Sequence, residues 1–168
     1  MRHVNVIDVY DVGETDGGNP FIVRELLRGE LLAQRLERGP LPLATSLAVL
    51  RDVGRGLAAA HAAGVVHRDL KPQNIYLHRD PDSNAPVVKL VDFAISRIDA
   101  EATLTVKGTP MGSPGYMAPE QARAGSVDRR ADIWAFGVIA YELFTGLPPF
   151  DGSTVGSILK KVTAGPLP

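Results

Sequence analysis

One octet of the sequence, His67 to Asn74 (HRDLKPQN), carries an acid, a cation and an amide at fixed offsets. The carboxylate of Asp69 can accept the proton of an incoming hydroxyl, and the cation of Lys71 can neutralise charge on a moving phosphoryl group. The side-chain carbonyl oxygen of Asn74 suits a hard cation, which prefers oxygen ligands. Phosphoryl transfer from a magnesium nucleotide to a hydroxyl requires this set of groups. The octet therefore predicts Asp69, Lys71 and Asn74 as catalytic residues, with Asn74 also a metal ligand.

A second acidic residue follows a short apolar run. Residues 87–91 (VVKLV) are typical of a strand, and Asp92 comes directly after them. Taken alone, Asp92 is more simply an aspartate that starts a turn. Together with Asp69 and Asn74 it is predicted to hold Mg²⁺ against the phosphates of a nucleotide.

Two further segments complete a recognisable pattern. Gly112 to Glu120 (GSPGYMAPE) combines a Pro- and Gly-rich loop with the start of a short helix, and Asp132 to Gly137 (DIWAFG) opens a strongly apolar helix. With the octet and residues 91–94 (VDFA), these segments resemble the motifs of serine/threonine protein kinases, most of all the bacterial eukaryotic-type kinases. The resemblance implies an α+β, protein-kinase-like fold, in which a mainly helical C-lobe follows a β-hairpin remnant of the N-lobe.

The expected strands and helices that position these residues occur along the chain in the order of the kinase fold. Residues 1–28 are expected to form N-lobe strands and the hinge, and residues 29–168 an incomplete C-lobe, within one partial protein kinase domain. The expected strands are 4–12, 21–26, 75–77 and 88–91, and the expected helices are 30–38, 43–63, 131–145 and 153–164. Gly64 and Gly146 are expected to end two of these helices.

The resemblance implies a nucleotide site beside the octet. Glu25 to Leu27 fall on the hinge, whose backbone groups bind the edge of adenine in the family, so Glu25 and Leu27 are expected in the cofactor site. Tyr76 falls where the family places an apolar floor beneath adenine, and Asp92 matches the family's metal ligand. The implied cofactors are ATP and Mg²⁺, with Mn²⁺ as an alternative, and the implied partners are proteins with Ser or Thr hydroxyls.

Other matched positions have structural roles in the family. His67 and Phe93 match two members of a stacked apolar spine, which is also what plain core packing would require. Asp132 resembles an aspartate whose carboxylate binds the backbone of the catalytic loop, and Glu120 resembles an acid that pairs with an arginine near the kinase C-terminus. For His61, just before the octet, packing is favoured over catalysis.

Regulation by phosphorylation is implied by Arg68, next to the catalytic aspartate, because a phosphate would give this cation a bidentate partner. Thr103, Thr105 and Thr109 are the candidate phosphorylation sites, and the simpler alternative for each is a solvated loop hydroxyl. Ser113 resembles the residue that binds the catalytic aspartate and lysine and shapes the substrate pocket.

The sequence departs from the family at several points. The Gly-rich loop, strand lysine and helix glutamate of a complete kinase are all expected before Met1. Ala94 replaces the glycine that usually follows Asp92-Phe93. Arg24 stands where the family has an apolar or small gatekeeper, and a buried, unpaired guanidinium would be costly there, unless it reaches outward to solvent. The arginine expected to pair with Glu120 is also missing.

Two hypotheses of different classes follow. The first is an active serine/threonine kinase of which this chain is a part, with the chain alone expected to be inactive. The second is a catalytically dead, pseudokinase-like binding module or a decaying gene fragment. A small-molecule phosphotransferase shares the chemistry, but the substrate segment from Gly112 to Glu120 argues against it.

Composition and charge narrow the class of protein further. The 168 residues suffice for one domain, 45% of them are hydrophobic, and the net charge is −1, so nothing favours a nucleic-acid partner or an anionic membrane surface. Without cysteine there is no disulfide framework. The first six residues lack the apolar region of a signal peptide, and the apolar run at 133–141 is too short to cross a bilayer. The sequence therefore predicts a cytoplasmic chain without a membrane segment, and leaves its oligomeric state open.

Overall fold

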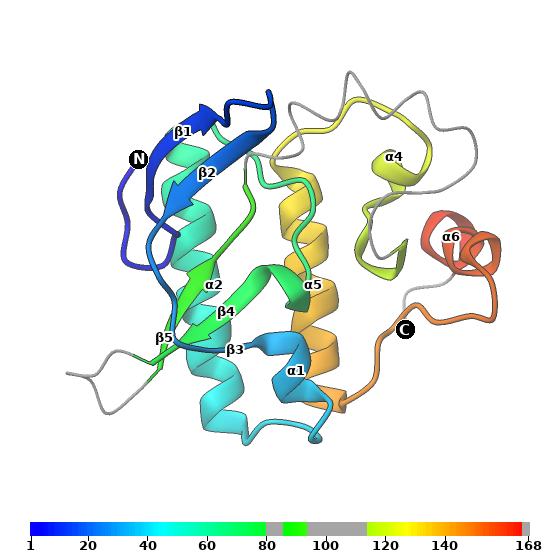
Figure 1. Ribbon diagram of the computed structural model, residues 1–168. Coiled ribbons are helices and arrows are strands. Elements are labelled where there is room, and N and C mark those ends of the chain that lie inside the picture. The colour runs from blue at the N-terminus through cyan, green and yellow to red at the C-terminus, as the bar shows by residue number, and fades with distance from the viewer. Residues whose placement is uncertain (80–85, 94–113, 166–168) are drawn as a thin grey trace.

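Two small antiparallel sheets lie against a set of helices in a computed structural model that describes residues 1–79, 86–93 and 114–165 (Figure 1). One sheet is the hairpin of β1 (Val9–Glu14) and β2 (Pro20–Arg24), and the other has the strand order β3-β4-β5, with β3 (Gly29–Leu31), β4 (Ile75–His78) and β5 (Val87–Leu90). The helices are α1 (Leu32–Leu36), α2 (Leu43–Ala62), the 3-10 turns η1 (Pro72–Asn74) and η3 (Pro114–Tyr116), α4 (Pro119–Ala122), α5 (Arg130–Thr145) and α6 (Val155–Ala164). This mixture confirms the α+β class predicted from the sequence.

The first strand is shorter than the alternating pattern predicted. The expected strand was 4–12, but β1 begins at Val9, because the residues before it pair with β5 instead. The backbone N–H of Leu90 donates to the carbonyl of Asn5 at 2.9 Å, and the N–H of Ile7 donates to the carbonyl of Leu90 at 2.9 Å. The N-terminal segment therefore forms the link between the hairpin and the three-stranded sheet.

The helix predicted at 30–38 is also shorter than expected. Glu30 and Leu31 are extended and pair with Leu77 and Tyr76 of β4, so the helix begins only at Leu32. The side chain of Gln34 accepts a hydrogen bond from the N–H of Leu31 at 3.0 Å and so caps the helix start. The first residues of the amphipathic pattern, Glu30 and Leu31, therefore form strand pairs, although the pattern alone predicts a helix there.

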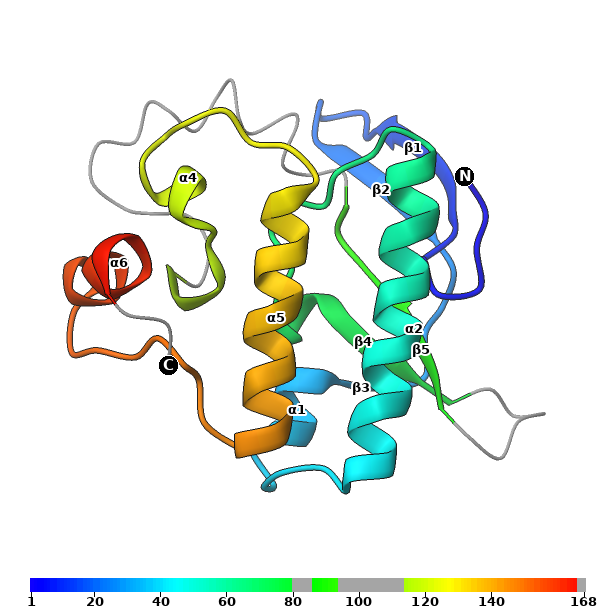
Figure 2. The same ribbon diagram turned by 180° about the vertical axis from the view of Figure 1, so that it is seen from behind.

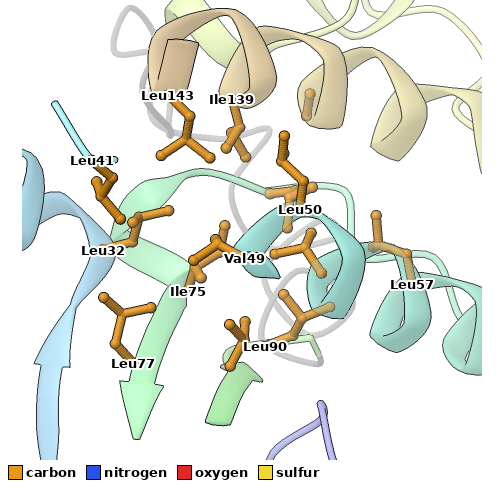
Figure 3. Close-up of a cluster of buried hydrophobic side chains, with 14 residues drawn as sticks. Leu32, Leu41, Val49, Leu50, Leu57, Ile75, Leu77, Leu90, Ile139 and Leu143 are labelled. Carbon is orange, nitrogen blue, oxygen red and sulfur yellow. The ribbon is translucent and has the colours of Figure 1, made fainter. Parts of the chain in front are cut away.

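Helices α2 and α5 lie side by side on one face of the three-stranded sheet, in front of it in Figure 2, and the main core lies between the two helices and the sheet (Figure 3). The apolar positions of α2 recur at helical spacing. The buried residues of β4 alternate as in a half-buried strand, whereas Val88, Lys89 and Leu90 of β5 are all buried. The core residues of these elements are Val49, Leu50, Val53 and Leu57 of α2, Ala135, Ile139 and Leu143 of α5, and Ile75, Leu77, Val88 and Leu90 of the sheet. Gly146 ends α5 in the left-handed conformation, as predicted.

A second, smaller cluster joins α6 to the rest of the molecule. It contains Val138, Phe150 and Val162, and Trp134 stacks on Phe150 with ring centroids 5.7 Å apart. Helix α6 begins at a capping box in which Thr154 accepts from the N–H of Ser157 at 3.1 Å. None of the helices in the described ranges has the length and apolar character needed to span a membrane.

Candidate active site

The octet forms the loop between α2 and β4, and the structure brings its three predicted catalytic residues together. Nζ of Lys71 lies 2.8 Å from Oδ2 of Asp69. The amide nitrogen of Asn74 donates to the backbone carbonyl of Asp69 at 2.7 Å and to its Oδ2 at 3.1 Å. The Asp69 side chain remains 43% exposed, whereas the Lys71 side chain is only 16% exposed. An accessible carboxylate is thus held in place by a cation and an amide.

The orientation of Asn74 leaves its side-chain oxygen available for a cation, because its nitrogen makes both hydrogen bonds to Asp69. Asp92 is brought close by the backbone, since the N–H of Val91 donates to the carbonyl of Asn74 at 3.0 Å. No group of three or more His, Cys, Asp or Glu residues in the described ranges can hold a metal by itself. The pair fits Mg²⁺, which is usually bound through one or two carboxylates together with phosphates and water.

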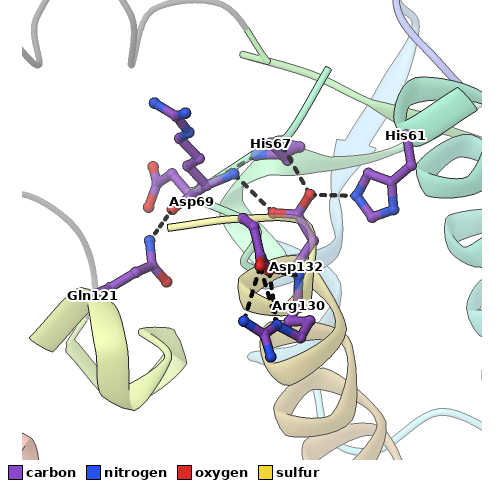
Figure 4. A network of polar contacts seen from close by, with 8 residues as sticks. His61, His67, Asp69, Gln121, Arg130 and Asp132 are labelled. Atoms are coloured by element: carbon purple, nitrogen blue, oxygen red, sulfur yellow. Dashed lines mark hydrogen bonds and ion pairs between the residues drawn. The ribbon is translucent and has the colours of Figure 1, made fainter. Parts of the chain in front are cut away.

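A buried carboxylate fixes the backbone of the loop (Figure 4). The N–H groups of His67 and Arg68 donate to the two oxygens of Asp132 at 2.9 and 2.8 Å, and Nε2 of His61 lies 2.7 Å from Oδ2. Arg68 has a φ of 67°, which a non-glycine residue adopts only when its surroundings compensate the strain. Asp132 therefore holds the residue before Asp69 in a conformation that it would not adopt alone. His61 is a polar partner of this carboxylate rather than a residue that only packs.

His67 connects the loop to the strand that carries Asp92. Its Nε2 donates to the carbonyl of Val91 at 3.0 Å, and its ring lies against Phe93 with centroids 4.5 Å apart. Burial lowers the pKa of His67 below its ordinary value, against the opposing effect of Asp132. The neutral imidazole therefore acts as a fixed structural bridge between the loop and the strand.

Glu25 contributes its side chain to the structure in a way that the sequence did not indicate. Its Oε1 accepts from Nζ of Lys89 at 2.7 Å and from the N–H of Asp8 at 2.8 Å. Lys89 lies opposite Tyr76 in the β4–β5 pairing, so their side chains project from the same face of the sheet. Leu27, two residues after Glu25, is half-buried. Glu25 of the predicted hinge and Tyr76, the predicted floor beneath adenine, thus both lie near Lys89 on one face of the three-stranded sheet.

Arg24 is paired and exposed, so the cost of a buried guanidinium does not arise. Its Nη1 lies 3.0 Å from Oδ1 of Asp92, and the two side chains are 51% and 37% exposed. Asp92 itself has a φ of 62°, the left-handed conformation that aspartate tolerates better than most residues.

Gln121 is a site residue that sequence reasoning missed. Its Nε2 donates to the carbonyl of Arg68 at 2.6 Å (Figure 4). Its Oε1 accepts from the N–H of Ala118 at 3.0 Å. The position of Gln121, three residues after the N-cap residue Ala118, indicated a capping role, but no local signal indicated the contact with Arg68. Glu120 lies in the first turn of the same helix, and its carboxylate makes no ion pair with any residue in the described ranges.

A cavity of about 290 Å³ lies beside the η1 turn of the loop. Gln73 lines it together with Glu37, Tyr116 and Glu142. The hydroxyl of Tyr116 donates to Oε2 of Glu142 at 2.5 Å. Burial raises the pKa of Glu142. Burial, and after it the contact with Glu142, raises the pKa of Tyr116.

Some residues singled out from the sequence lie outside the described residues. They are Ala94, Thr103, Thr105, Thr109 and Ser113.

The fold and the loop together define a protein kinase domain, and comparison with known families agrees. The chain matches the protein kinase domain over residues 1–165 and therefore belongs to the protein kinase family. This confirms the family resemblance and the kinase-like fold predicted from the motifs.

Three curated relatives that the chain resembles are all serine/threonine-protein kinases. The chain is 48% identical over 154 residues to serine/threonine-protein kinase PknL of Mycobacterium tuberculosis, covering 91% of this chain and 37% of that protein. It is 43% identical over 175 residues to serine/threonine-protein kinase pkn3 of Myxococcus xanthus, covering 100% of this chain and 32% of that protein. Serine/threonine-protein kinase pkn2 of the same organism is 37% identical, with 20% of its length covered. By family the chain belongs with these bacterial serine/threonine protein kinases, and it spans 20% to 37% of the length of the three relatives.

Proposed function

We propose that this chain is the catalytic part of a kinase that transfers the γ-phosphate of ATP to Ser and Thr hydroxyls of proteins. The observation that supports this most strongly is the hydrogen-bonded group of Asp69, Lys71 and Asn74 beside Asp92. A carboxylate, an ammonium and an amide held together support the proposal, because phosphoryl transfer depends on positioning and charge neutralisation more than on strong acid-base chemistry.

Each residue then has a distinct role. The exposed carboxylate of Asp69 orients the substrate hydroxyl and accepts its proton. Lys71, held at 2.8 Å from Asp69, offsets negative charge on the phosphoryl group as it moves. Asn74 Oδ1 and the Asp92 carboxylate would hold the metal, and the metal-bound nucleotide supplies the phosphoryl group and offsets its charge. The all-oxygen donor set suits Mg²⁺, with Mn²⁺ as the alternative.

The cavity beside the loop supports a protein substrate. Gln73, which lines it, belongs to the same turn as Asn74, so the cavity adjoins the loop that carries Asp69. Glu37 and Glu142 on its wall favour a basic side chain of the substrate segment.

We also propose that residues 1–28 form N-lobe strands and the hinge, and that residues 29–168 form an incomplete C-lobe. We propose a cytoplasmic location for the chain, because ATP is available there.

One observation favours a second candidate, a catalytically dead binding module. Arg24 already contacts Asp92 at 3.0 Å, so the predicted metal ligand has a partner. If this contact excluded the metal, the chain would retain its fold and its surfaces but not its chemistry.

Calorimetric titration of Mg·ATP into the 168-residue chain, with Asp92→Asn as the control variant, distinguishes the two candidates. We expect binding to the natural chain and its loss in Asp92→Asn, because the variant removes the charge that holds the metal. A folded natural chain that binds no Mg·ATP would contradict the proposed site and favour the binding module.

A further inference from the structure

Arg24 is held over Asp92 by the fold and not only by its own side chain. Its backbone pairs with Val9 at the end of the hairpin. The next residue, Glu25, is fastened to β5 by the 2.7 Å contact with Lys89. The strand end that carries Arg24 is therefore anchored on both sides, within reach of Asp92, which lies two residues after the end of β5.

The charges around Asp92 leave Arg24 as its counter-ion. Within the described residues, Lys71 is paired with Asp69 and Lys89 with Glu25, and Arg24 is the only cation within 4.0 Å of an Asp92 oxygen. Oδ1, which Arg24 contacts, belongs to the carboxylate that would bind the metal. A divalent cation that binds there must displace the guanidinium or bind beside its positive charge, and either event weakens binding.

We propose that Arg24 is an internal competitor of the metal at Asp92, and that it lowers the affinity of the site for a divalent cation. This inference rests on the proposed metal site of Asn74 and Asp92. It assigns to Arg24 a control over metal affinity that is separate from the catalytic groups, none of which contacts its guanidinium in the described structure.

The test uses Mn²⁺ alone as a paramagnetic probe of the 168-residue chain. Free Mn²⁺ is counted by electron paramagnetic resonance, and the bound ion is located by broadening of the amide resonances of Asn74 and Asp92. In Arg24→Gln the charge is lost, but the side chain can still donate a hydrogen bond. We expect Arg24→Gln to bind Mn²⁺ about two- to fivefold more tightly, the range for loss of an exposed ion pair. Arg55→Gln removes the charge of an arginine on α2 that is also exposed, and is expected to leave Mn²⁺ binding unchanged.

The outcomes separate this inference from the proposed function. Equal or weaker Mn²⁺ binding by Arg24→Gln, with the broadening still at Asn74 and Asp92, overturns the role of Arg24 and leaves the metal site standing. A folded natural chain and a folded Arg24→Gln chain that both fail to bind Mn²⁺, or that bind it elsewhere, overturn the inference and the metal site together. Arg24→Lys, which keeps the charge, is expected to stay close to the natural chain.

Discussion

At the scale of single residues, Asp132 determines the geometry of the loop more than any catalytic residue does. Its buried carboxylate accepts hydrogen bonds from two consecutive backbone N–H groups and contacts His61. Hydrogen bonds to a buried charge contribute more than neutral ones, because the charge has no water to replace a lost partner. The conformation of the loop therefore depends on a residue 63 positions after Asp69 in the sequence.

Replacement of this carboxylate by an amide tests that dependence. In Asp132→Asn one oxygen becomes an N–H donor that faces backbone N–H groups, so we expect the free energy of unfolding to fall by about 2–4 kcal/mol. Urea denaturation measures the change. The control is Asp128→Asn, four residues earlier, which weakens an exposed pair with Arg130 and should lower the free energy of unfolding far less than Asp132→Asn does. Similar losses in the two variants would contradict the role of Asp132.

The buried His67 predicts a specific dependence of stability on pH. Burial lowers its pKa in the folded protein below the ordinary value of 6.5, so the unfolded chain takes up a proton before the folded one does. The contribution of neutral His67 to the free energy of unfolding is complete above pH 6.5. It falls as the pH decreases from 6.5 to the pKa of His67 in the folded protein, and it levels off below that pKa. Denaturation at a series of pH values should show this decline, and His67→Phe should reduce it. An unchanged slope in the variant would contradict this account.

At the scale of secondary-structure elements, the close approach of α2 to the sheet sets the position of the loop that follows it. The approach depends on Gly56, where an added Cβ would lie 2.8 Å from the carbonyl oxygen of Asn5 and 2.8 Å from the side chain of Leu90. A larger residue would push the helix away from the N-terminal segment and from β5.

A pair of glycines two residues apart in α2 tests this contact. Gly56→Ala should lower the free energy of unfolding by about 1–3 kcal/mol, because the added methyl meets backbone as well as side chain. Gly54→Ala is the matched control, since its Cβ would meet only Phe136 at 4.0 Å and alanine favours the helix by about 0.5–1 kcal/mol. Thermal unfolding of both variants measures the difference, and equal midpoints would contradict the prediction.

The sequence predicted most elements and the chemical groups of the site, because both leave local signals. The octet, Asp92 and the helical spacing in α2 and α5 each lie within a short window. The contacts of Gln121 with Arg68 and of Lys89 with Glu25 join residues 53 and 64 positions apart, and nothing in a local pattern selects those partners. The strand ends were wrong for a related reason, since Asn5 and Ile7 pair with Leu90 and not with the hairpin.

At the scale of the whole molecule, the cavity beside the loop exists only because several elements meet. Its lining residues come from α1, η1, η3 and α5, which are brought together by the packing of the two long helices and the sheet. Four segments far apart in the sequence therefore build the surface that we propose for a basic side chain of the substrate.

Glu142→Gln tests this assignment without disturbing the fold, because glutamine can still accept the hydrogen bond from Tyr116. We expect an arginine-containing peptide to bind about fivefold more weakly, as for the loss of one partly exposed charge pair. Fluorescence polarisation with a labelled peptide measures the affinity. The same peptide with alanine in place of arginine should bind the natural chain and Glu142→Gln with equal affinity. Glu14→Gln in β1, which removes a charge far from the cavity in sequence, serves as the charge-matched control. An unchanged affinity for the arginine peptide would contradict the proposed role of the cavity.

The stacking of Trp134 on Phe150 has a practical consequence for following these experiments. Trp134 is the single tryptophan of the chain, and it lies in the small cluster next to α6 and not in the main core. Intrinsic fluorescence thus reports the environment of one corner of the molecule, while circular dichroism averages over all its helices. Coincidence of the two signals during denaturation is the criterion for a single cooperative transition, on which every free-energy difference above depends.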